Sequence, residues 1–369
     1  MRVLFLANAA SVHTVRWVNA LSERGNEVHL VYKSDDEPRE NIISPKIVLH
    51  KLKYSGSKGY FLNAVQLRKI FILVKPHIVN AHYASGYGTL ARIARLKPLI
   101  LSVWGSDVYD FPYQSRLKMK IVIDNLKFAD RIASTSKIMA EQVKSLLNEK
   151  GKFVAITPFG IDLSMFSRTE NILKDEIIIG NIKSLKEVYG LDYLINSIKI
   201  LKNNLEKKEA SDLSDRIRLY IYGDGPEKEK LTNLINQLDL NNTVLLKGKI
   251  PNNKVPKALE LIDIFCATSI QESFGVSLLE AMAMELPIVA TNVPGFLEIV
   301  DNYSTGVIVE SRNAESIAKA LEMLVIDKDL RISMGKQGRN KVEKFYDWKE
   351  NVNLMISLYI DTIKDYDTW

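Results

Sequence analysis

CATSIQESFGVSLLEAMAMELPIVAT, residues 266–291, is the stretch from which the fold of the chain can be worked out. It begins at the end of an apolar run that predicts a strand, and it passes through the polar turn QESFG. It then predicts a helix from about Val276 to Met284 and a second strand over PIVAT. A helix that begins at a glycine-containing turn after a strand presents unpaired backbone N–H groups and the positive end of its dipole to an anion. We therefore expect the stretch to hold a phosphorylated ligand rich in hydroxyl groups.

Two carboxylates frame the predicted helix start, Glu272 in the turn and Glu280 two turns along. Glu280 lies in SLLEAMAM, which is apolar nearly all round, so its carboxylate requires a partner; it could accept both hydroxyls of a ribose. Glu272 could accept sugar hydroxyls while nearby backbone amides donate to a diphosphate. Those amides belong to Ser273, Phe274, Gly275 and Val276. The alternative is that Glu272 is an ordinary loop acid and Glu280 a solvated helix residue.

Outside this stretch, short apolar runs alternate with helical periodicity along the whole chain. The predicted strands are 2–7, 27–32, 46–51, 77–81, 99–103, 131–134, 153–157, 177–182, 216–223, 243–248, 262–267, 287–291 and 306–310. This alternation predicts an α/β protein with two Rossmann-like parallel-sheet domains. Turn formers gather at 158–167, so we expect domains at 1–163 and 164–348, with a helix at 349–369 that packs back on the first. A ligand is expected in a cleft between the domains, at the carboxyl ends of the strands.

Composition restricts the class of protein. The 369 residues suit two domains, and the single cysteine, Cys266, excludes a disulfide framework and a cysteine-based metal cluster. The five histidines show no ligand spacing, so we expect no metal site. The N-terminal apolar run is too short for a signal peptide, and no stretch approaches the ~20 apolar residues that cross a bilayer. We therefore expect a cytoplasmic protein.

Charge is distributed unevenly along the chain. Residues 1–150 contain 23 Lys and Arg against 12 Asp and Glu, whereas the remainder contains 27 against 32. A basic half is either a solvated surface or a surface for an anionic partner such as membrane lipid, a lipid-linked phosphate or nucleic acid. We expect no nucleic-acid partner, because no recognition module or aromatic-basic motif is visible.

The run ESFGVSLLEAMAMELPIVAT, with NVPGFLEIV and TGVIV, resembles the donor-site signature of the retaining glycosyltransferases of family 4, which have the GT-B fold. The family's E-x7-E pattern matches Glu272 and Glu280. Further blocks agree in order: PFGIDLSMF, YGLDYLINSI, YGDGPEKEKL and LLKGKIP. The resemblance implies that the second domain binds a nucleotide diphosphate sugar as co-substrate, with no cofactor, and that the first binds an acceptor. It also implies metal-independent transfer with retention, in which Glu272 has a catalytic role and no protein nucleophile is required.

The family pattern also places cations beside the diphosphate, usually as G-R-x4-K-G after the first strand of the second domain. Here the loop reads GNIKSLKEVYG, with Tyr189 where the lysine would precede Gly190. Lys183 and Lys186 are the candidates, and Lys183 is preferred as the catalytic cation; the alternative is that both are ordinary exposed lysines. Gly223, in YGDGP, is expected at the donor site as well.

In the first domain the family often has a histidine in H-G-x-D, where this chain has VWGSD. Trp104 stands in the histidine position and could pack against a sugar face, although a structural tryptophan is the alternative. Asp107 is kept and is a candidate catalytic residue. The remaining candidates for an acceptor or for the cleft are His13, Thr14 and Arg16 at the first helix, and His82 at a strand end.

A basic and apolar segment of the first half could face a membrane, although a solvated helix is equally consistent with it. Its residues are Tyr60, Phe61, Arg68, Lys69, Arg116, Lys118, Lys120 and Lys127, with the apolar Leu117, Met119, Ile121 and Val122 between them. The resemblance implies a hexosyltransferase that uses a UDP-type nucleotide sugar and a glycan or lipid-linked acceptor in cell-surface polysaccharide or glycoconjugate synthesis. It could make peripheral contact with the inner face of the plasma membrane. The alternatives are a nucleotide-sugar epimerase on the same fold and a non-enzymatic nucleotide-binding protein.

Overall fold

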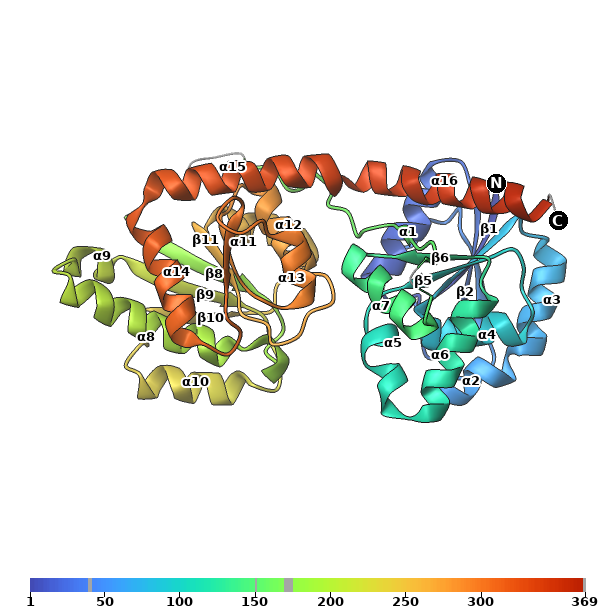
Figure 1. Ribbon diagram of the computed structural model, residues 1–369, viewed down its shortest axis with the longest axis horizontal. Coiled ribbons are helices and arrows are strands. Elements are labelled where there is room, and N and C mark those ends of the chain that lie inside the picture. Colours follow the sequence, from blue (N-terminus) through green and yellow to red (C-terminus); the bar gives the residue numbers. More distant parts are fainter. Residues whose placement is uncertain (39–41, 150, 169–174, 368–369) are drawn as a thin grey trace. The chain divides into compact units, whose positions relative to one another are not determined.

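The computed structural model describes residues 1–38, 42–149, 151–168 and 175–367. The chain divides into two compact units (Figure 1). Unit 1 comprises Met1–Pro158 and Lys349–Trp369, and unit 2 comprises Phe159–Trp348. The first change of unit therefore falls at Pro158–Phe159, where the expected boundary was 163/164, and the second falls at 348/349. The last two residues of the predicted helix 349–369 lie outside the described residues.

Among the described residues, unit 1 contains a seven-stranded parallel sheet in the order β3-β2-β1-β4-β5-β6-β7. Its strands are β1 (Arg2–Leu6), β2 (Glu27–Lys33), β3 (Val48–Leu52), β4 (Ile78–His82), β5 (Leu99–Val103), β6 (Arg131–Ser134) and β7 (Ala155–Ile156). β4 and β5 are buried along their whole length, as expected of parallel strands covered by helices on both faces.

The helices of unit 1 connect these strands (Figure 1). They are α1 (Val12–Glu23), α2 (Gly56–Leu62), α3 (Ala64–Val74), the π-helix η1 (Tyr83–Tyr87), α4 (Gly88–Ile93), α5 (Ser106–Tyr109), the 3-10 helix η2 (Phe111–Gln114), α6 (Arg116–Phe128) and α7 (Lys137–Leu147). Their inward faces supply apolar side chains to one core with the sheet, among them Leu67, Leu90, Leu126 and Val143.

The C-terminal helix α16 (Trp348–Asp367) belongs to unit 1 from Lys349 onward. The buried hydroxyl of Tyr359 donates to Asn80 Oδ1 on β4 at 2.8 Å. Arg24, the residue that follows α1, donates to the Lys349 carbonyl at 3.1 Å and to Asn353 Oδ1 at 3.1 Å. The last helix is therefore tied to the first unit by a buried hydrogen bond and by contacts at its start.

Unit 2 has a six-stranded parallel sheet, counted over its described residues, in the order β10-β9-β8-β11-β12-β13. The strands are β8 (Ile177–Ile182), β9 (Ile217–Tyr222), β10 (Val244–Gly248), β11 (Ile264–Ala267), β12 (Ile288–Thr291) and β13 (Gly306–Val309). The helical segments are η3 (Glu187–Tyr189), α8 (Leu191–Lys207), α9 (Ser211–Asp215), α10 (Lys228–Gln237), η4 (Asn252–Lys254), α11 (Val255–Glu260), α12 (Val276–Ala283), α13 (Pro294–Ile299), α14 (Ala314–Ile326) and α15 (Lys328–Phe345).

Both sheets change direction of winding at one point. In unit 1 the connections run outward from β1 through β2 to β3, and then from β4 to β7 on the other side; unit 2 repeats this with β8 and β11. The predicted pair of Rossmann-like parallel-sheet domains is therefore confirmed. In such sheets the connecting loops separate at the carboxyl ends of the two strands where the order reverses, and ligands bind there. We call the β1–β4 position of unit 1 and the β8–β11 position of unit 2 the winding changes of the two sheets. A ligand site is expected at these positions.

Candidate functional site

In unit 2, the loops after β8 and β11 are joined by an ion pair. Lys183 is the first residue after β8, and Glu272 lies in the turn between β11 and α12. The Lys183 Nζ lies 2.5 Å from Glu272 Oε2, and the two side chains are 23% and 17% exposed. The predicted cation and the predicted sugar-binding acid therefore meet at the winding change of the sheet. Each remains open enough to exchange its partner for a ligand.

A glycine places the backbone of Lys183. The Lys183 amide donates to the Tyr222 carbonyl at 2.9 Å, so the chain after β8 runs alongside the end of β9. The next residue, Gly223, has φ +158°, and a Cβ there would lie 1.8 Å from the Lys183 carbonyl oxygen. Gly223 was predicted to bind the donor. In the structure, the absence of a side chain at Gly223 leaves room for the backbone of the loop that carries Lys183.

This contact predicts a large difference between two glycines. Gly223→Ala is expected to destabilise unit 2 by about 3 kcal/mol or more, because the added methyl group would overlap a backbone carbonyl. Gly248→Ala is the matched control: its φ is +75°, but nothing lies within 4 Å of a Cβ there, so only the backbone strain of about 1 kcal/mol applies. Urea unfolding of both variants measures this. Equal losses would show that the Lys183 contact is not tight in solution.

The start of α12 is formed by glycines and a buried phenylalanine. Gly275, with φ +107°, precedes the helix, and Gly295 approaches so closely that a Cβ would lie 2.5 Å from the Phe274 amide nitrogen. The Phe274 ring is buried and lies against Phe159 and Tyr346. The predicted ligand contact of Phe274 can therefore come only from its main chain. The backbone amide of Phe274, like the amides of Ser273, Gly275 and Val276, lies at the positive end of the α12 dipole.

The other predicted donor residues differ in exposure. Glu280 lies on α12 and is half-buried, whereas Lys186 is exposed and its backbone amide donates to the Ser184 carbonyl at 3.0 Å. The structure thus favours Lys183 over Lys186 as the candidate cation, because Lys183 pairs with Glu272, another predicted donor-site residue.

Sequence reasoning missed the groups that support Lys183. Its Nζ lies 4.5 Å from the centre of the Tyr189 ring, and the Tyr189 carbonyl accepts a bond from Thr268 Oγ1 at 3.1 Å. Asn181 of β8 donates to the Cys266 carbonyl at 2.7 Å, which ties β8 to β11. The one available signal was Gly190, whose φ is +57° and where a Cβ would lie 2.4 Å from the Thr268 carbonyl oxygen.

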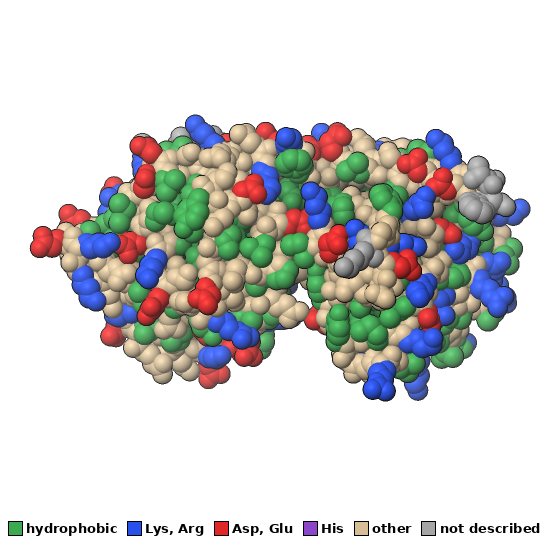
Figure 2. Space-filling view, in the orientation of Figure 1, with side chains coloured by type: hydrophobic (Ala, Val, Ile, Leu, Met, Phe, Trp, Pro, Cys, Tyr) green, Lys and Arg blue, Asp and Glu red, His purple; other side chains and the backbone are tan. Residues whose placement is uncertain are grey.

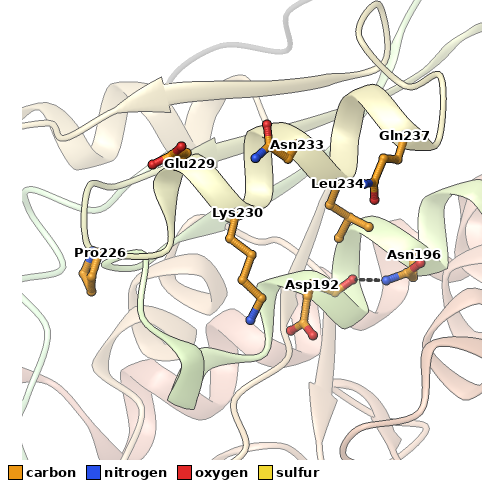
Figure 3. A pocket seen from close by; sticks show the side chains of 8 residues that line it. All are labelled: Asp192, Asn196, Pro226, Glu229, Lys230, Asn233, Leu234 and Gln237. Atoms are coloured by element: carbon orange, nitrogen blue, oxygen red, sulfur yellow. Dashed lines mark hydrogen bonds between the residues drawn. The ribbon is translucent and has the colours of Figure 1, made fainter.

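A separate surface hollow of about 570 Å³ lies between α8 and α10 (Figure 3). Its lining residues are Asp192, Asn196, Pro226, Glu229, Lys230, Asn233, Leu234 and Gln237. Lys230 points across it toward Asp192 in Figure 3 and pairs with Glu227 at 2.8 Å. None of the predicted donor-site residues lines this hollow, so it is distinct from the Lys183–Glu272 site.

In unit 1, aromatic rings from the start of α1, from the end of β4 with η1, and from the loop after β5 meet at the winding change between β1 and β4. The Trp104 ring, from the loop after β5, makes edge contacts with His13, His82 and Tyr83 at centroid distances of 5.7, 4.7 and 5.2 Å. Trp104, Tyr83 and His13 are half-buried. Tyr83 has φ +71°, an unusual backbone conformation for a tyrosine. The cluster offers partly exposed apolar ring surface of the kind that packs against a sugar face.

The structure corrects the predicted catalytic role of Asp107. Its side chain is 1% exposed and accepts three backbone N–H bonds, from Ala84 at 2.7 Å, Gly105 at 2.9 Å and Trp104 at 3.1 Å. Burial raises the pKa of the carboxyl, and these backbone bonds oppose that shift. Asp107 therefore positions the Trp104 and Ala84 loops and does not itself face a ligand.

The side chains of His82 and Thr14 are both buried in unit 1. His82 is fully buried: its Nε2 bonds Asn80 Oδ1 at 2.9 Å, and its ring stacks on Phe5 at 4.2 Å. Thr14 has no exposed surface either. The prediction that the His82 side chain reaches a ligand is wrong, because it is packed inside unit 1. The prediction for Thr14 rests on the backbone amides at the start of α1 and stays a prediction. His13 and Arg16 remain half-buried at the start of α1.

Burial of two histidines predicts that unit 1 loses stability in mild acid. Burial lowers the pKa of His82 to about 3, and burial with the nearby Arg16 charge lowers the pKa of His13 to about 4. The unfolded chain binds protons below its own pKa of about 6.5, whereas the folded chain does not. The contribution of these histidines to the free energy of unfolding is therefore complete above about pH 6.5. It decreases as the pH drops toward their pKa values in the folded chain.

Between about pH 6.5 and about pH 5, the free energy of unfolding is expected to fall by roughly 2 kcal/mol for each histidine. Urea unfolding followed by tryptophan fluorescence, at several pH values, measures it. His82→Gln should remove the share of the pH dependence that His82 contributes, and leave the shares of His13 and of His50, whose pKa burial also lowers. The same slope in wild type and variant would contradict the assignment of His82 as a buried neutral ring.

Within the described ranges, no group of three or more His, Cys, Asp or Glu residues could hold a metal ion. The helices of those same ranges include none with the length and apolar character needed to cross a membrane.

Comparison with known proteins adds independent information. Residues 165–341 match the family model described as glycosyl transferases group 1, and residues 2–136 match one described as glycosyl transferase 4-like. The chain is 22% identical over 364 residues to the N-acetyl-alpha-D-glucosaminyl L-malate synthase of Bacillus anthracis, a match that covers 94% of this chain and 92% of that protein.

A second relative is the UDP-Gal:alpha-D-GlcNAc-diphosphoundecaprenol alpha-1,3-galactosyltransferase of Escherichia coli. It is 28% identical over 316 residues, which are 81% of this chain and 79% of that protein. Among solved structures, sucrose-phosphate synthase from Thermosynechococcus elongatus superposes with a TM-score of 0.82 over 99% of this chain and 100% of that one, at 17% identity. That likeness shows a common fold.

Proposed function

The chain belongs to the group 1, or family 4-like, glycosyl transferases, and on this premise we propose that it transfers a sugar from a nucleotide diphosphate donor to an acceptor hydroxyl, with retention of anomeric configuration. The observation that carries the proposal is the Lys183–Glu272 pair at the β8–β11 winding change, beside the start of α12. A cation, a carboxylate and a helix N-terminus are the groups that a nucleotide sugar requires there.

Each part of the donor has a matching group. Glu280 accepts the two ribose hydroxyls, the backbone amides from Ser273 to Val276 and the Lys183 ammonium hold the diphosphate, and Glu272 accepts hydroxyls of the sugar. Lys183 and Glu272 neutralise one another before the donor binds. The donor then separates their roles, because the phosphates attract the ammonium while the sugar hydroxyls donate to the carboxylate.

The reaction needs no protein nucleophile in this arrangement. The bond between the anomeric carbon and the diphosphate oxygen breaks, and a bond from the acceptor oxygen forms on the same face of the sugar. The acceptor proton passes to the departing phosphate. The chain contributes positioning and stabilisation of the developing negative charge by Lys183 and the α12 amides. No metal ion is part of the proposed mechanism.

We assign acceptor binding to unit 1, where the Trp104, Tyr83 and His13 rings provide half-buried surface for a sugar ring. The names of the two relatives indicate different acceptors, L-malate for one and a lipid diphosphate carrying GlcNAc for the other. We favour a glycan or lipid-linked acceptor for a cell-surface polysaccharide or glycoconjugate, because an aromatic cluster fits a sugar face better than a small carboxylic acid.

A thermal-shift screen of nucleotide sugars, followed by product analysis, tests the proposal. The correct donor should raise the unfolding temperature, since it binds only the folded state. Transfer should then require an added acceptor. Release of an epimerised sugar nucleotide from donor alone would show an epimerase on the same fold. Donor binding without turnover, over a panel of glycan and lipid-linked acceptors, would show a binding protein.

A further inference from the structure

One side of unit 1 exposes large apolar side chains along two successive helices, α2 and α3. The exposed fractions are 50% for Phe61, 56% for Leu62, 69% for Val65, 58% for Ile72 and 80% for Leu73. Single exposed apolar residues are common on protein surfaces, but a contiguous apolar patch marks an interaction site. We call the surface formed by these residues the α2–α3 face.

The residues of the α2–α3 face follow helical spacing. Leu62, Val65, Lys69 and Ile72 recur at intervals of three and four, so they project from one side of the helical segment. The opposite side of α3 is occupied separately, because Ala64, Leu67 and Val74 are buried in the core of unit 1. The core therefore does not account for the outward apolar residues.

Positive charge surrounds these apolar residues. Lys58, Arg68, Lys69 and Lys75 are exposed on or beside α2 and α3, and residues 51–100 contain no acid at all. The Arg68 guanidinium donates to the Arg95 carbonyl, a neutral acceptor, at 3.0 Å. On the side of unit 1 where Figure 1 labels α3, Figure 2 shows hydrophobic and cationic side chains next to one another.

We propose that the α2–α3 face is a docking surface for an anionic lipid bilayer. Apolar side chains at the centre of a cationic rim are the chemistry by which a surface helix enters the headgroup region, and each Lys or Arg near an anionic membrane adds to the affinity. A second copy of the chain is a poorer occupant, because it would bring two sets of unpaired cations together. This docking is independent of the sugar-transfer chemistry, which is placed in other parts of the chain.

The structure moves the membrane surface away from α6, where the sequence also placed it. On α6, Lys120 pairs with Asp124 at 3.6 Å, and Lys118 bonds Gln114 at 2.5 Å and lies over the Phe111 ring. Tyr60, predicted to belong to the patch, is half-buried against the Tyr87 ring. Leu117 is 68% exposed there, which makes it a matched control for the apolar residues of the α2–α3 face.

Flotation of the full-length chain with vesicles tests the proposal. Wild type should float with phosphatidylcholine vesicles that contain phosphatidylglycerol, and high salt should release it. The double variant Val65→Glu/Leu73→Glu should partition at least about tenfold less, because two charges replace side chains that would enter the bilayer. Lys69→Ala/Lys75→Ala should also lose about tenfold, but only on anionic vesicles. Leu117→Glu, and Ile326→Glu in unit 2, should bind as wild type does.

Three outcomes would overturn the proposal. One is equal flotation of wild type and Val65→Glu/Leu73→Glu; another is loss of binding in Leu117→Glu alone, which would place the contact on α6. A third is a wild-type dimer, seen by analytical ultracentrifugation without vesicles, that Val65→Glu/Leu73→Glu converts to monomer, since the face would then join two copies. Nucleotide-sugar binding, measured on the same variants, is expected to stay unchanged and separates this result from a failure of the donor-site assignment.

Discussion

Glu280→Ala is expected to abolish sugar transfer while unit 2 stays folded. The carboxylate is half-buried on α12, and its proposed partners are two ribose hydroxyls. Loss of two charge-assisted hydrogen bonds at about 1.5–3 kcal/mol each lowers kcat/KM by a factor between about a hundred and ten thousand. Steady-state kinetics with the donor found by thermal shift, together with urea unfolding of the variant, measure both halves of this expectation.

Glu280→Gln supplies the control for size. It keeps the volume of the side chain but removes its charge, so it should retain the fold and still lose most of the activity. Full activity in Glu280→Ala would remove the ribose assignment. A variant that fails to fold would be distinguished by its unfolding curve, and Glu280→Gln would then decide the question.

Lys183→Ala is expected to weaken binding of the nucleoside diphosphate by about tenfold to a hundredfold, which corresponds to one charge-assisted bond to phosphate. The loss has a second cause: without the ammonium, the Glu272 carboxylate that lies 2.5 Å from it would face the phosphates uncompensated. Isothermal titration of UDP into wild type and variant measures the effect. Lys186→Ala is the matched control, since that lysine of the same loop is exposed, and it should bind UDP within about twofold of wild type.

Glu272→Gln separates the two halves of the ion pair. The substitution releases Lys183 from its partner, so the affinity for UDP alone should stay the same or rise. The affinity for UDP-sugar should fall about tenfold, because an amide replaces the charged acceptor of the sugar hydroxyls. A parallel loss for UDP and UDP-sugar would mean that Glu272 supports the loop and does not contact the sugar.

The fold could be predicted because its signals are local. Parallel strands covered on both faces read as short continuous apolar runs, and helices between them show a period of 3.6, so β8 was expected at 177–182 and is found at Ile177–Ile182. The signal for the helix that begins at Val276 was also local, because a turn that ends at Gly275 is followed by a run of apolar residues that favour helix. The bounds of a short edge strand were predicted less accurately, since β7 was expected at 153–157 and spans only Ala155–Ile156.

The site could be predicted only in part, because its contacts join residues far apart in the chain. Lys183 and Glu272 are 89 residues apart, and their pairing depends on the strand order β8-β11. Asp107 looked catalytic because its type and position fit a motif. Its three backbone bonds arise only where the loops after β4 and β5 meet. His82 stands at the end of a strand, and only packing against Phe5 and Trp104 shows that it is inside.

The central claim is that the nucleotide diphosphate binds at the β8–β11 winding change of unit 2. A crystal structure of the full chain soaked with UDP tests it most directly. The account predicts the diphosphate between the Lys183 ammonium and the backbone amides of Ser273 to Val276, with the ribose hydroxyls on Glu280. Electron density for UDP in the hollow between α8 and α10, beside Asp192 and Lys230, or on unit 1, would contradict it.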